Sequence, residues 1–240
     1  AATGQDKFHE HFGPFPEGFM HIHANDEAEL TAALTSGKVC AILMEMVQGE
    51  GGVIPLEKSY VQLAEKLCRV NDVLFMVDEV QTGNGRTGEL YAYMDYGVQP
   101  DVVSTAKGLG GGLPLGAALL SEKVQNVLGF GDHGSTFGGN PVCCAGALSI
   151  LQRIDDALLA DVKKKGEYIR QQLEGAKGIK GISGMGLMVG IQTEKPAGQL
   201  VKALVEKGVL CLTAKDKVRL LPALNIPMED LEYAIETIKA

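Results

Sequence analysis

Three apolar segments of the sequence each end in residues with reactive side chains. These segments span residues 39–44, 73–77 and 102–103. Glu45 follows the first, Asp78 the second, and Lys107 lies four positions beyond the third. If the segments are neighbouring strands of a parallel sheet, their carboxyl ends share one edge, where open α/β sheets bind ligands. Two carboxylates and an amine could then converge on one crevice, and a lysine partly shielded from water can attack a carbonyl to form a Schiff base.

Asp78 and Lys107 also have simpler interpretations. Asp78 could merely cap the turn that follows its strand, and Lys107 could be an ordinary surface lysine. However, Lys107 precedes the glycine-rich run Gly108–Gly112. So much glycine after an apolar strand predicts a close backbone approach or unusual backbone angles, which a solvated lysine would not need.

Residues Gly83–Gly88 match the pattern G-x-G-x-x-G. The dinucleotide-binding form of this pattern begins directly after a strand, opens a long helix and is followed about 20 residues later by a strand ending in an acid. Here the first glycine lies five positions beyond Asp78, and the segment that follows is short and stops before Pro100. We therefore expect no nicotinamide or flavin site.

Two further segments carry groups that could bind anions. Gly134–Pro141 leads into a helix, and its hydroxyls and free N–H groups could hold a phosphate or simply cap that helix. Arg219 lies within an apolar strand, where its guanidinium needs a carboxylate partner. That partner could be a structural acid or the carboxylate of a substrate.

The elements that must position these residues alternate along the chain. Apolar runs at 39–44, 73–77, 102–103 and 115–120 predict strands, and helical spacing predicts helices over 27–35 and 57–69. The first 26 residues are expected to be extended and irregular. Buried strands separated by helices indicate an α/β fold with a largely parallel sheet.

The pattern changes beyond Pro141, where helices are expected up to about residue 173 with a break at Asp155-Asp156. A smaller set of elements follows, with strand signals over 179–193, 209–213 and 218–221 and helices over 198–207 and 229–239. We therefore expect a domain boundary near residue 155, with a large domain over 1–155 and a small α+β domain over 156–240.

Composition excludes several classes of protein. The chain has 240 residues, of which 45% are hydrophobic and 22% charged, as in globular proteins. Its 22 Lys and Arg against 30 Asp and Glu give a net charge of −8, which argues against nucleic acid and anionic membranes as partners. No apolar run approaches the length of a membrane span, and the first residues lack the layout of a secretory signal.

Neither cysteines nor histidines suggest a metal site. The cysteines are Cys40, Cys68, Cys143, Cys144 and Cys211. Their odd number and the absence of C-x-x-C predict free, mostly buried thiols in a reducing cytoplasm. Two H-x-H pairs occur, His9 with His11 and His21 with His23, but no further ligand completes a site at useful spacing.

Three of these segments together resemble the class III, fold-type I, pyridoxal-phosphate-dependent aminotransferases. They are Val77–Gly88, Lys107–Gly112 and His133–Pro141, and their order and spacing fit that family over essentially the whole chain. The resemblance implies an aminotransferase with pyridoxal 5'-phosphate as cofactor. It also implies a homodimer, because Thr136 would contact the phosphate of the partner subunit's cofactor.

The resemblance implies further roles around the cofactor. Lys107 would hold it as a Schiff base and then move the substrate proton. Asp78 would pair with the pyridine nitrogen and keep it protonated. Val80 would pack on the ring face, and Gln81 would hydrogen-bond the ring hydroxyl oxygen.

Substrate roles are implied in the same way. Arg219 would grip the α-carboxylate of glutamate or 2-oxoglutarate, and Glu50 would pair with Arg219 when the donor is an ω-amine. Glu45 would lie near the ring. The segments 48–52 and 83–88 are most similar to members that use N-acetylornithine, in arginine biosynthesis, while ornithine and 4-aminobutyrate enzymes share much of the pattern. Met46 stands where family members commonly have Pro, and we expect only a packing change there.

The chain resembles the C-terminal part of such an enzyme. Family members carry a longer N-terminal portion, which supplies a phosphate-binding turn, an aromatic ring for the other cofactor face and several strands of the central sheet. We therefore expect a sheet with exposed edges and apolar surface, and an enzyme that needs its N-terminal portion. The alternative is a non-catalytic remnant that binds a partner or cofactor.

Overall fold

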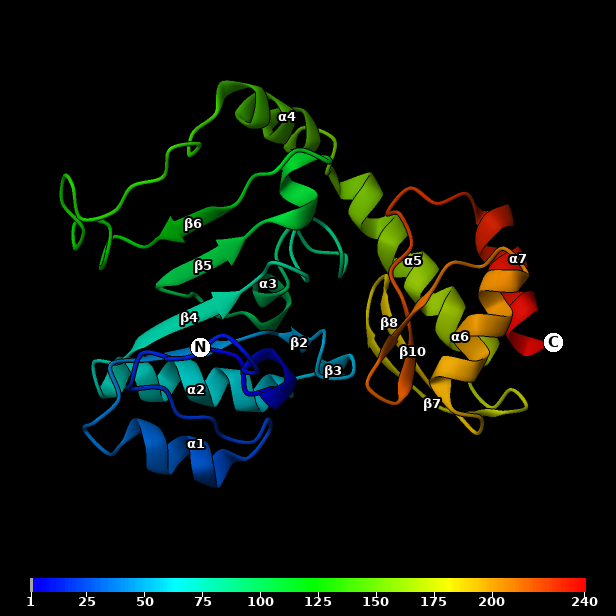
Figure 1. Cartoon of the computed structure of the whole chain (residues 1–240), viewed down its shortest axis with the longest axis horizontal. Coiled ribbons are helices and arrows are strands. Elements are labelled where there is room, and N and C mark those ends of the chain that lie inside the picture. Colours follow the sequence, from blue (N-terminus) through cyan, green and yellow to red (C-terminus); the bar gives the residue numbers. More distant parts are fainter. Residues whose placement is uncertain (1) are drawn as a thin grey trace.

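A mainly parallel β-sheet forms the centre of the N-terminal part, residues 2–155, in a computed structural model that describes residues 2–240 (Figure 1). Strands β1 (Ala41–Met44), β4 (Leu74–Asp78) and β5 (Val102–Thr105) run parallel, and β6 (Ala117–Leu120) pairs antiparallel with β5. The order across the sheet is β1-β4-β5-β6. The predicted α/β class is confirmed, and the polar ends of the three parallel strands lie along one edge.

Helices α1 (Glu27–Leu34) and α2 (Lys58–Val70) pack together on one side of this sheet, with the short helix α3 (Tyr93–Tyr96) beside them (Figure 1). Asp26 caps α1, since its carboxylate accepts two N–H bonds from the first helical turn. The spacing of apolar residues along α2 turns one face to the sheet. The core formed there contains Leu30, Leu34, Met46, Tyr60, Val61, Ala64, Phe75 and Val77.

The β6 side of the sheet is much more open. All four residues of β6 are exposed, and the helix α4 (Pro141–Leu151) that follows it also leaves apolar side chains in solvent. The exposed apolar residues of this region are Leu113, Leu119, Leu120, Val127, Leu128, Phe130, Phe137, Val142, Leu148 and Leu151. The expected exposure of apolar surface is confirmed. Burial of β1 on both faces is not, because Ile42 and Met44 pack on the helix-covered core while Leu43 stays 48% exposed.

A second sheet forms the centre of the C-terminal part, residues 156–240. Its strands are antiparallel in the order β7-β8-β10-β9. They are β7 (Ile179–Met185), β8 (Met188–Thr193), β9 (Leu212–Ala214) and β10 (Lys217–Leu220). The helices that accompany them are α5 (Asp156–Leu173), α6 (Ala197–Glu206) and α7 (Met228–Lys239). Their shared core includes Ile169, Leu173, Leu187, Ile191, Leu204, Val218, Leu231 and Ile235.

The segment between the two sheets follows the predicted pattern. α4 ends at Leu151 and α5 begins at Asp156, capped by Asp155, whose carboxylate accepts the Leu158 N–H at 2.8 Å. In Figure 1, α5 follows α4 and leads along the second sheet.

Several elements differ from the expectation. The strand expected at 209–213 is observed at Leu212–Ala214, and the pair β2 (Val47–Gln48) and β3 (Ile54–Pro55) was not predicted. Residues 2–26 are irregular as expected, apart from the 3₁₀ turn η1 (Asp6–Phe8), and residue 1 lies outside the described residues.

Most of the cysteine thiols are buried or half-buried. Cys68, Cys143 and Cys211 are buried and Cys144 is half-buried, whereas Cys40 is exposed just before β1, contrary to the expectation of burial. No helix in residues 2–240 is long and apolar enough to cross a membrane. The same residues contain no group of His, Cys, Asp and Glu arranged to hold a metal ion.

Candidate active site

The shared edge of the parallel strands brings Glu45, Asp78 and Lys107 into one electrostatic neighbourhood. Met44 is paired with Val77 and Asp78 with Ser104, so residues directly beyond β1, β4 and β5 reach the same edge. Burial raises the pKa of the Glu45 carboxyl, the negative charge of Asp78 raises it further, and the positive charge of Lys107 opposes both. The two carboxylates and the amine are therefore close enough at this edge for their charges to influence one another.

Asp78 ends β4 with a half-buried carboxylate. Its Oδ1 accepts the N–H of Val80 at 2.9 Å, so this oxygen does cap the turn after the strand. No hydrogen bond among the described residues engages its Oδ2. One oxygen thus fixes the side chain, and the other remains able to accept a proton donor.

Glu79 is a structural residue of the site that sequence reasoning missed. Its side chain is fully buried, and it accepts the Thr82 hydroxyl at 2.5 Å and the Tyr93 N–H at 2.8 Å. Burial raises the pKa of its carboxyl, while these hydrogen bonds oppose the rise. The bonds stabilise the turn that carries Val80 and Gln81. An acid next to Asp78 with a threonine three positions later was the available signal.

Lys107 begins the 3₁₀ turn η2 (Lys107–Gly110) in the left-handed region, with φ of 45°. Its side chain is exposed rather than shielded, and no ion pair of residues 2–240 engages its amine. The glycine run packs tightly against α4, since a Cβ at Gly111 (φ 59°) would lie 2.6 Å from the Ile150 side chain. The predicted close approach and unusual backbone angles of the glycine run are therefore confirmed.

Arg219 and Glu50 form an ion pair between the two parts of the chain. Arg219 Nη1 lies 2.7 Å from Glu50 Oε1, although the residues are 169 positions apart. The Arg219 side chain is 7% exposed and that of Glu50 43%. The hydrogen bond from Arg219 lowers the pKa of the Glu50 carboxyl, and one from Gln81 acts in the same direction. The buried Nε of Arg219 has no hydrogen-bond partner within residues 2–240.

Val80 is half-buried on the turn after Asp78, beside Gln81. Thr136 lies in the exposed loop between β6 and α4, and no described hydrogen bond joins it to the strand-end group. It does not cap α4 either, because Asn140 does so by accepting the Val142 and Cys143 N–H groups. The structure thus brings together Glu45, Glu50, Asp78, Gln81, Lys107 and Arg219, but not Thr136.

The loop Gly83–Gly88 does not lead into a long helix. The next helix is α3, which begins only at Tyr93 and has four residues. The loop instead contacts the C-terminal part, where the Arg86 side chain donates to the carbonyl oxygens of Leu187 and Pro222. This packing provides no helix N-terminus for a dinucleotide.

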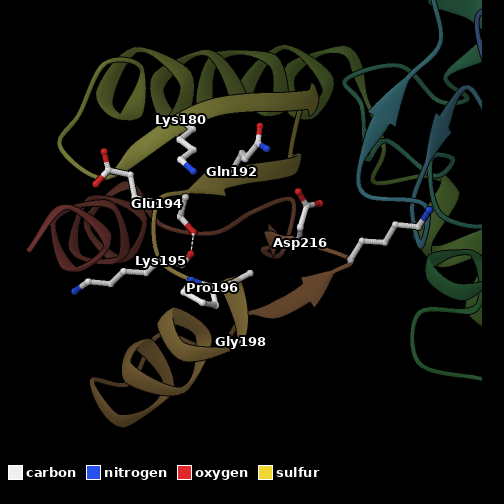
Figure 2. Close-up of a pocket in the computed structure, with 10 residues that line it drawn as sticks. Lys180, Gln192, Glu194, Lys195, Pro196, Gly198 and Asp216 are labelled. Atoms are coloured by element: carbon white, nitrogen blue, oxygen red, sulfur yellow. Dashed lines mark hydrogen bonds between the residues drawn. The ribbon is translucent and has the colours of Figure 1, made fainter.

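Two cavities lie in the C-terminal part. One, of about 400 Å³, is lined by both signs of charge, with Lys180, Glu194 and Asp216 around it (Figure 2), so it favours no single ligand charge. The other, of about 240 Å³, lies beside Arg219 and is otherwise lined by Leu210, Cys211, Leu212 and Leu221. Only the second adjoins a residue of the candidate site.

Comparison with known proteins gives one consistent family. The family model described as Aminotransferase class-III matches residues 1–240. The acetylornithine aminotransferase of Haemophilus ducreyi is 47% identical over 99% of this chain, and that of Caldanaerobacter subterraneus is 43% identical over 99%. A solved ornithine aminotransferase from Toxoplasma gondii, described with partial occupancy of PLP, superposes over 98% of this chain with a TM-score of 0.92 and 36% identity.

The chain spans only part of these proteins. It covers 61% of the Haemophilus ducreyi protein, 62% of the Caldanaerobacter subterraneus protein and 58% of the Toxoplasma gondii chain. A solved N-acetylornithine aminotransferase from Stenotrophomonas maltophilia matches with a TM-score of 0.85 and 34% identity, over 94% of this chain and 62% of its own.

Proposed function

The chain belongs to the class-III aminotransferase family, and on that premise we propose that it supplies the catalytic lysine and the substrate-binding arginine of a pyridoxal-phosphate-dependent enzyme. The proposed reaction moves an amino group from N-acetylornithine, or a related ω-amine, to 2-oxoglutarate, as a step of arginine biosynthesis. The observation that carries the proposal is the meeting of Lys107, Asp78 and Glu45 at one sheet edge.

The residues present fit the aldehyde and the pyridine nitrogen of the cofactor. An aldehyde needs an amine, and Lys107 offers one that no described ion pair engages. A protonated pyridine nitrogen needs a carboxylate, and Asp78 offers a held side chain with one oxygen left to accept. For the phosphate the chain offers Thr136 in an exposed loop, which suits a group belonging to a partner subunit.

When bound, pyridoxal phosphate supplies a ring that accepts electrons from the substrate carbon bearing the amino group. Asp78 would pair with the ring nitrogen, and Val80 and Gln81 would hold the ring. The Lys107 amine would accept the proton released by the substrate carbon that bears the amino group, and would donate it again later in the reaction. Glu45, whose carboxyl is influenced by the charge of Lys107, would help to orient this amine.

Arg219 and Glu50 would let one site accept substrates of different charge. With an ω-amine donor, Glu50 occupies the guanidinium as observed, at 2.7 Å. With 2-oxoglutarate, the substrate carboxylate takes the place of Glu50. The large difference in exposure between Glu50 and Arg219 supports this exchange, because Glu50 can move into solvent while the buried Arg219 stays in place.

We also propose the larger assembly. Residues 1–155 and 156–240 would be the large and small domains, the enzyme would be a homodimer, and the N-terminal portion that this chain does not contain would complete the site. The open β6 side of the sheet supports such a need. Light scattering on the completed protein tests the dimer, and limited proteolysis near residue 155 tests the boundary.

The central test joins this chain to the part of the Haemophilus ducreyi relative that the chain does not cover, and the product is the completed protein. Incubation with pyridoxal phosphate, borohydride reduction and peptide mapping should find the cofactor on Lys107. Lys107→Ala should lose this label and lower the rate with N-acetylornithine and 2-oxoglutarate about 1,000-fold or more, with Lys123→Ala as the control. A completed protein without label at Lys107 would refute the proposal and favour the non-catalytic remnant.

The amino donor needs its own comparison. Rates with N-acetylornithine, ornithine and 4-aminobutyrate should favour N-acetylornithine. Preference for ornithine would instead agree with the Toxoplasma gondii neighbour.

A further inference from the structure

Residues 83–88, here called the linking loop, contact both halves of the proposed site. The loop follows the turn that carries Gln81, and most of its residues are buried. One of its side chains reaches the backbone just before Lys107, and another reaches the segments around the strand that carries Arg219. The proposed function does not assign this loop any role.

At its first end the linking loop holds the chain before Lys107. Asn84, only 6% exposed and left-handed with φ of 57°, donates from Nδ2 to the Ala106 carbonyl at 3.2 Å and to Thr105 Oγ1 at 3.3 Å. Since Ala106 directly precedes Lys107, these bonds fix where the lysine leaves the sheet edge.

At its other end the linking loop holds the C-terminal part through Arg86. Its Nη1 donates to the Leu187 carbonyl at 3.2 Å and to the Pro222 carbonyl at 2.5 Å, while its own carbonyl accepts the Leu187 N–H at 3.0 Å. Pro222 lies three positions after Arg219, and Leu187 lies in the turn between β7 and β8. Arg86 therefore spans the boundary between the two parts with backbone acceptors alone among the described residues.

This contact buries the Arg86 guanidinium and brings the backbones of the two parts very close together. Burial without a carboxylate lowers the pKa of the Arg86 guanidinium to about 10. Gly186, with φ of 52°, lies so close that a Cβ there would be 2.5 Å from the Thr87 carbonyl carbon. An exposed ion pair between Lys163 and Glu89 also joins the two parts, but such surface pairs contribute little.

We propose that Arg86 is a positioning residue that sets Arg219 relative to Lys107. This inference rests on the proposed function. A substrate whose carboxylate is attached to the reacting carbon must contact Arg219 and Lys107 at once, so its alignment depends on that setting. An ω-amine donor, for which Glu50 occupies Arg219, depends on it much less. Arg86 should therefore matter for the 2-oxo acid half of the reaction and not for the ω-amine half.

The two half-reactions can be followed separately by rapid-mixing absorbance of the bound cofactor in the completed protein. Arg86→Met should lower the second-order rate constant of the half-reaction with 2-oxoglutarate about 10- to 100-fold. The second-order rate constant of the half-reaction with N-acetylornithine should change less than about threefold. Arg86→Lys, which can keep one carbonyl contact, should fall between. Lys163→Met removes the Lys163–Glu89 ion pair, another of the contacts between the parts, and should change neither half.

A measurement without cofactor gives an independent readout. Hydrogen exchange on this chain should show faster exchange of the Leu187 amide and of residues 217–222 in Arg86→Met, and not in Arg153→Met, which removes an exposed arginine. If Arg86→Met does not fold, Arg86→Lys carries both measurements.

The outcomes separate the inference from the proposed function. An unsubstituted completed protein that carries no cofactor at Lys107 refutes the proposed function. A working completed protein in which the Arg86 variant slows both half-reactions equally, or neither, refutes only the positioning role. Unchanged exchange at Leu187 and 217–222 refutes it as well.

Discussion

The two sheets of this protein differ in how completely the chain covers them. Both have four strands, but the antiparallel C-terminal sheet shares a core with α5, α6 and α7, in which Ile169, Leu187 and Ile235 are fully buried. The N-terminal sheet is covered by α1 and α2, whereas β6 is exposed along its whole length. The C-terminal part therefore closes its own core, and the N-terminal part carries the reactive side chains on a sheet with one open side.

This difference has a physical basis in chain connectivity. Antiparallel neighbours such as β7 and β8 need only a tight turn, so a short stretch of chain can complete a sheet and its helices. Parallel strands need long crossovers, and their functional ends gather residues from distant segments. A chain that spans 61% of a relative can thus contain a finished antiparallel unit and a parallel sheet with an open edge.

The largest expected effect tests that contrast directly. Ile235→Ala, in the C-terminal core, should lower the free energy of unfolding by about 3 kcal/mol, because it removes fully buried methyl groups and leaves a cavity. Leu120→Ala, on β6, should cost less than about 1 kcal/mol, because that side chain is 45% exposed. Urea unfolding followed by circular dichroism measures both. Equal losses would mean that β6 is covered in solution, for example by self-association, which dilution would reverse.

A smaller effect, on the pH dependence of stability, distinguishes the carboxylate of Glu79, inside the N-terminal part, from that of Glu50, which joins the two parts. The pKa of buried Glu79 is raised above its ordinary 4.5, so its contribution to stability is greatest at low pH and falls as pH rises through the raised value. The pKa of Glu50 is lowered from 4.5, so its contribution is present above 4.5 and is lost as pH falls through the lowered value.

Glu79→Gln and Glu50→Gln should therefore change the pH dependence of unfolding in opposite directions. As pH rises, the stability of the unsubstituted protein should fall relative to Glu79→Gln and should rise relative to Glu50→Gln. The Glu50 effect should stay below about 1 kcal/mol, because its partly exposed side chain is screened by solvent. Urea unfolding between pH 3.5 and about pH 7 checks this. Parallel slopes for the two variants would contradict the assignment.

The parts of the site that sequence could predict are those determined locally. Asp78 ends one apolar strand and Lys107 follows another, so the change from apolar to polar residues alone marks their position at the sheet edge. The pairing of Arg219 with Glu50 crosses 169 positions, so the resemblance to the family indicated the acid where no spacing rule could. Glu79 was missed because successive residues at a strand end face opposite sides, so an acid beside an exposed one can point into the core.

The fold shows the same division between local and distant determinants. Helices α1, α2 and α7 follow from their periodicity to within a residue or two. The apolar run that suggested a strand at 209–213 is buried at Val209 and Cys211, yet the ladder begins only at Leu212. Buried irregular chain and a buried strand both give an apolar run in the sequence, and only the pairing with β10 distinguishes the two.

The smallest perturbation compares two thiols at the same end of the helix-covered layer, next to the start of β4. Cys40 is exposed just before β1, while Cys68 lies in α2, where burial raises the pKa of its thiol to about 12. Since the thiolate is the nucleophile, iodoacetamide at pH 8 should label Cys40 at least about 100-fold faster than Cys68, with mass spectrometry as the readout.

Cys40→Ser provides the control for that labelling, since it should remove the fast phase and leave stability unchanged. Slow labelling of Cys68 means that the α2 side of the N-terminal sheet stays closed even though the β6 side is open. Comparable rates at the two thiols would contradict this, because they require α2 to open frequently. The exposure of β6 would then reflect a loosely held N-terminal part rather than one open edge on a well-packed layer.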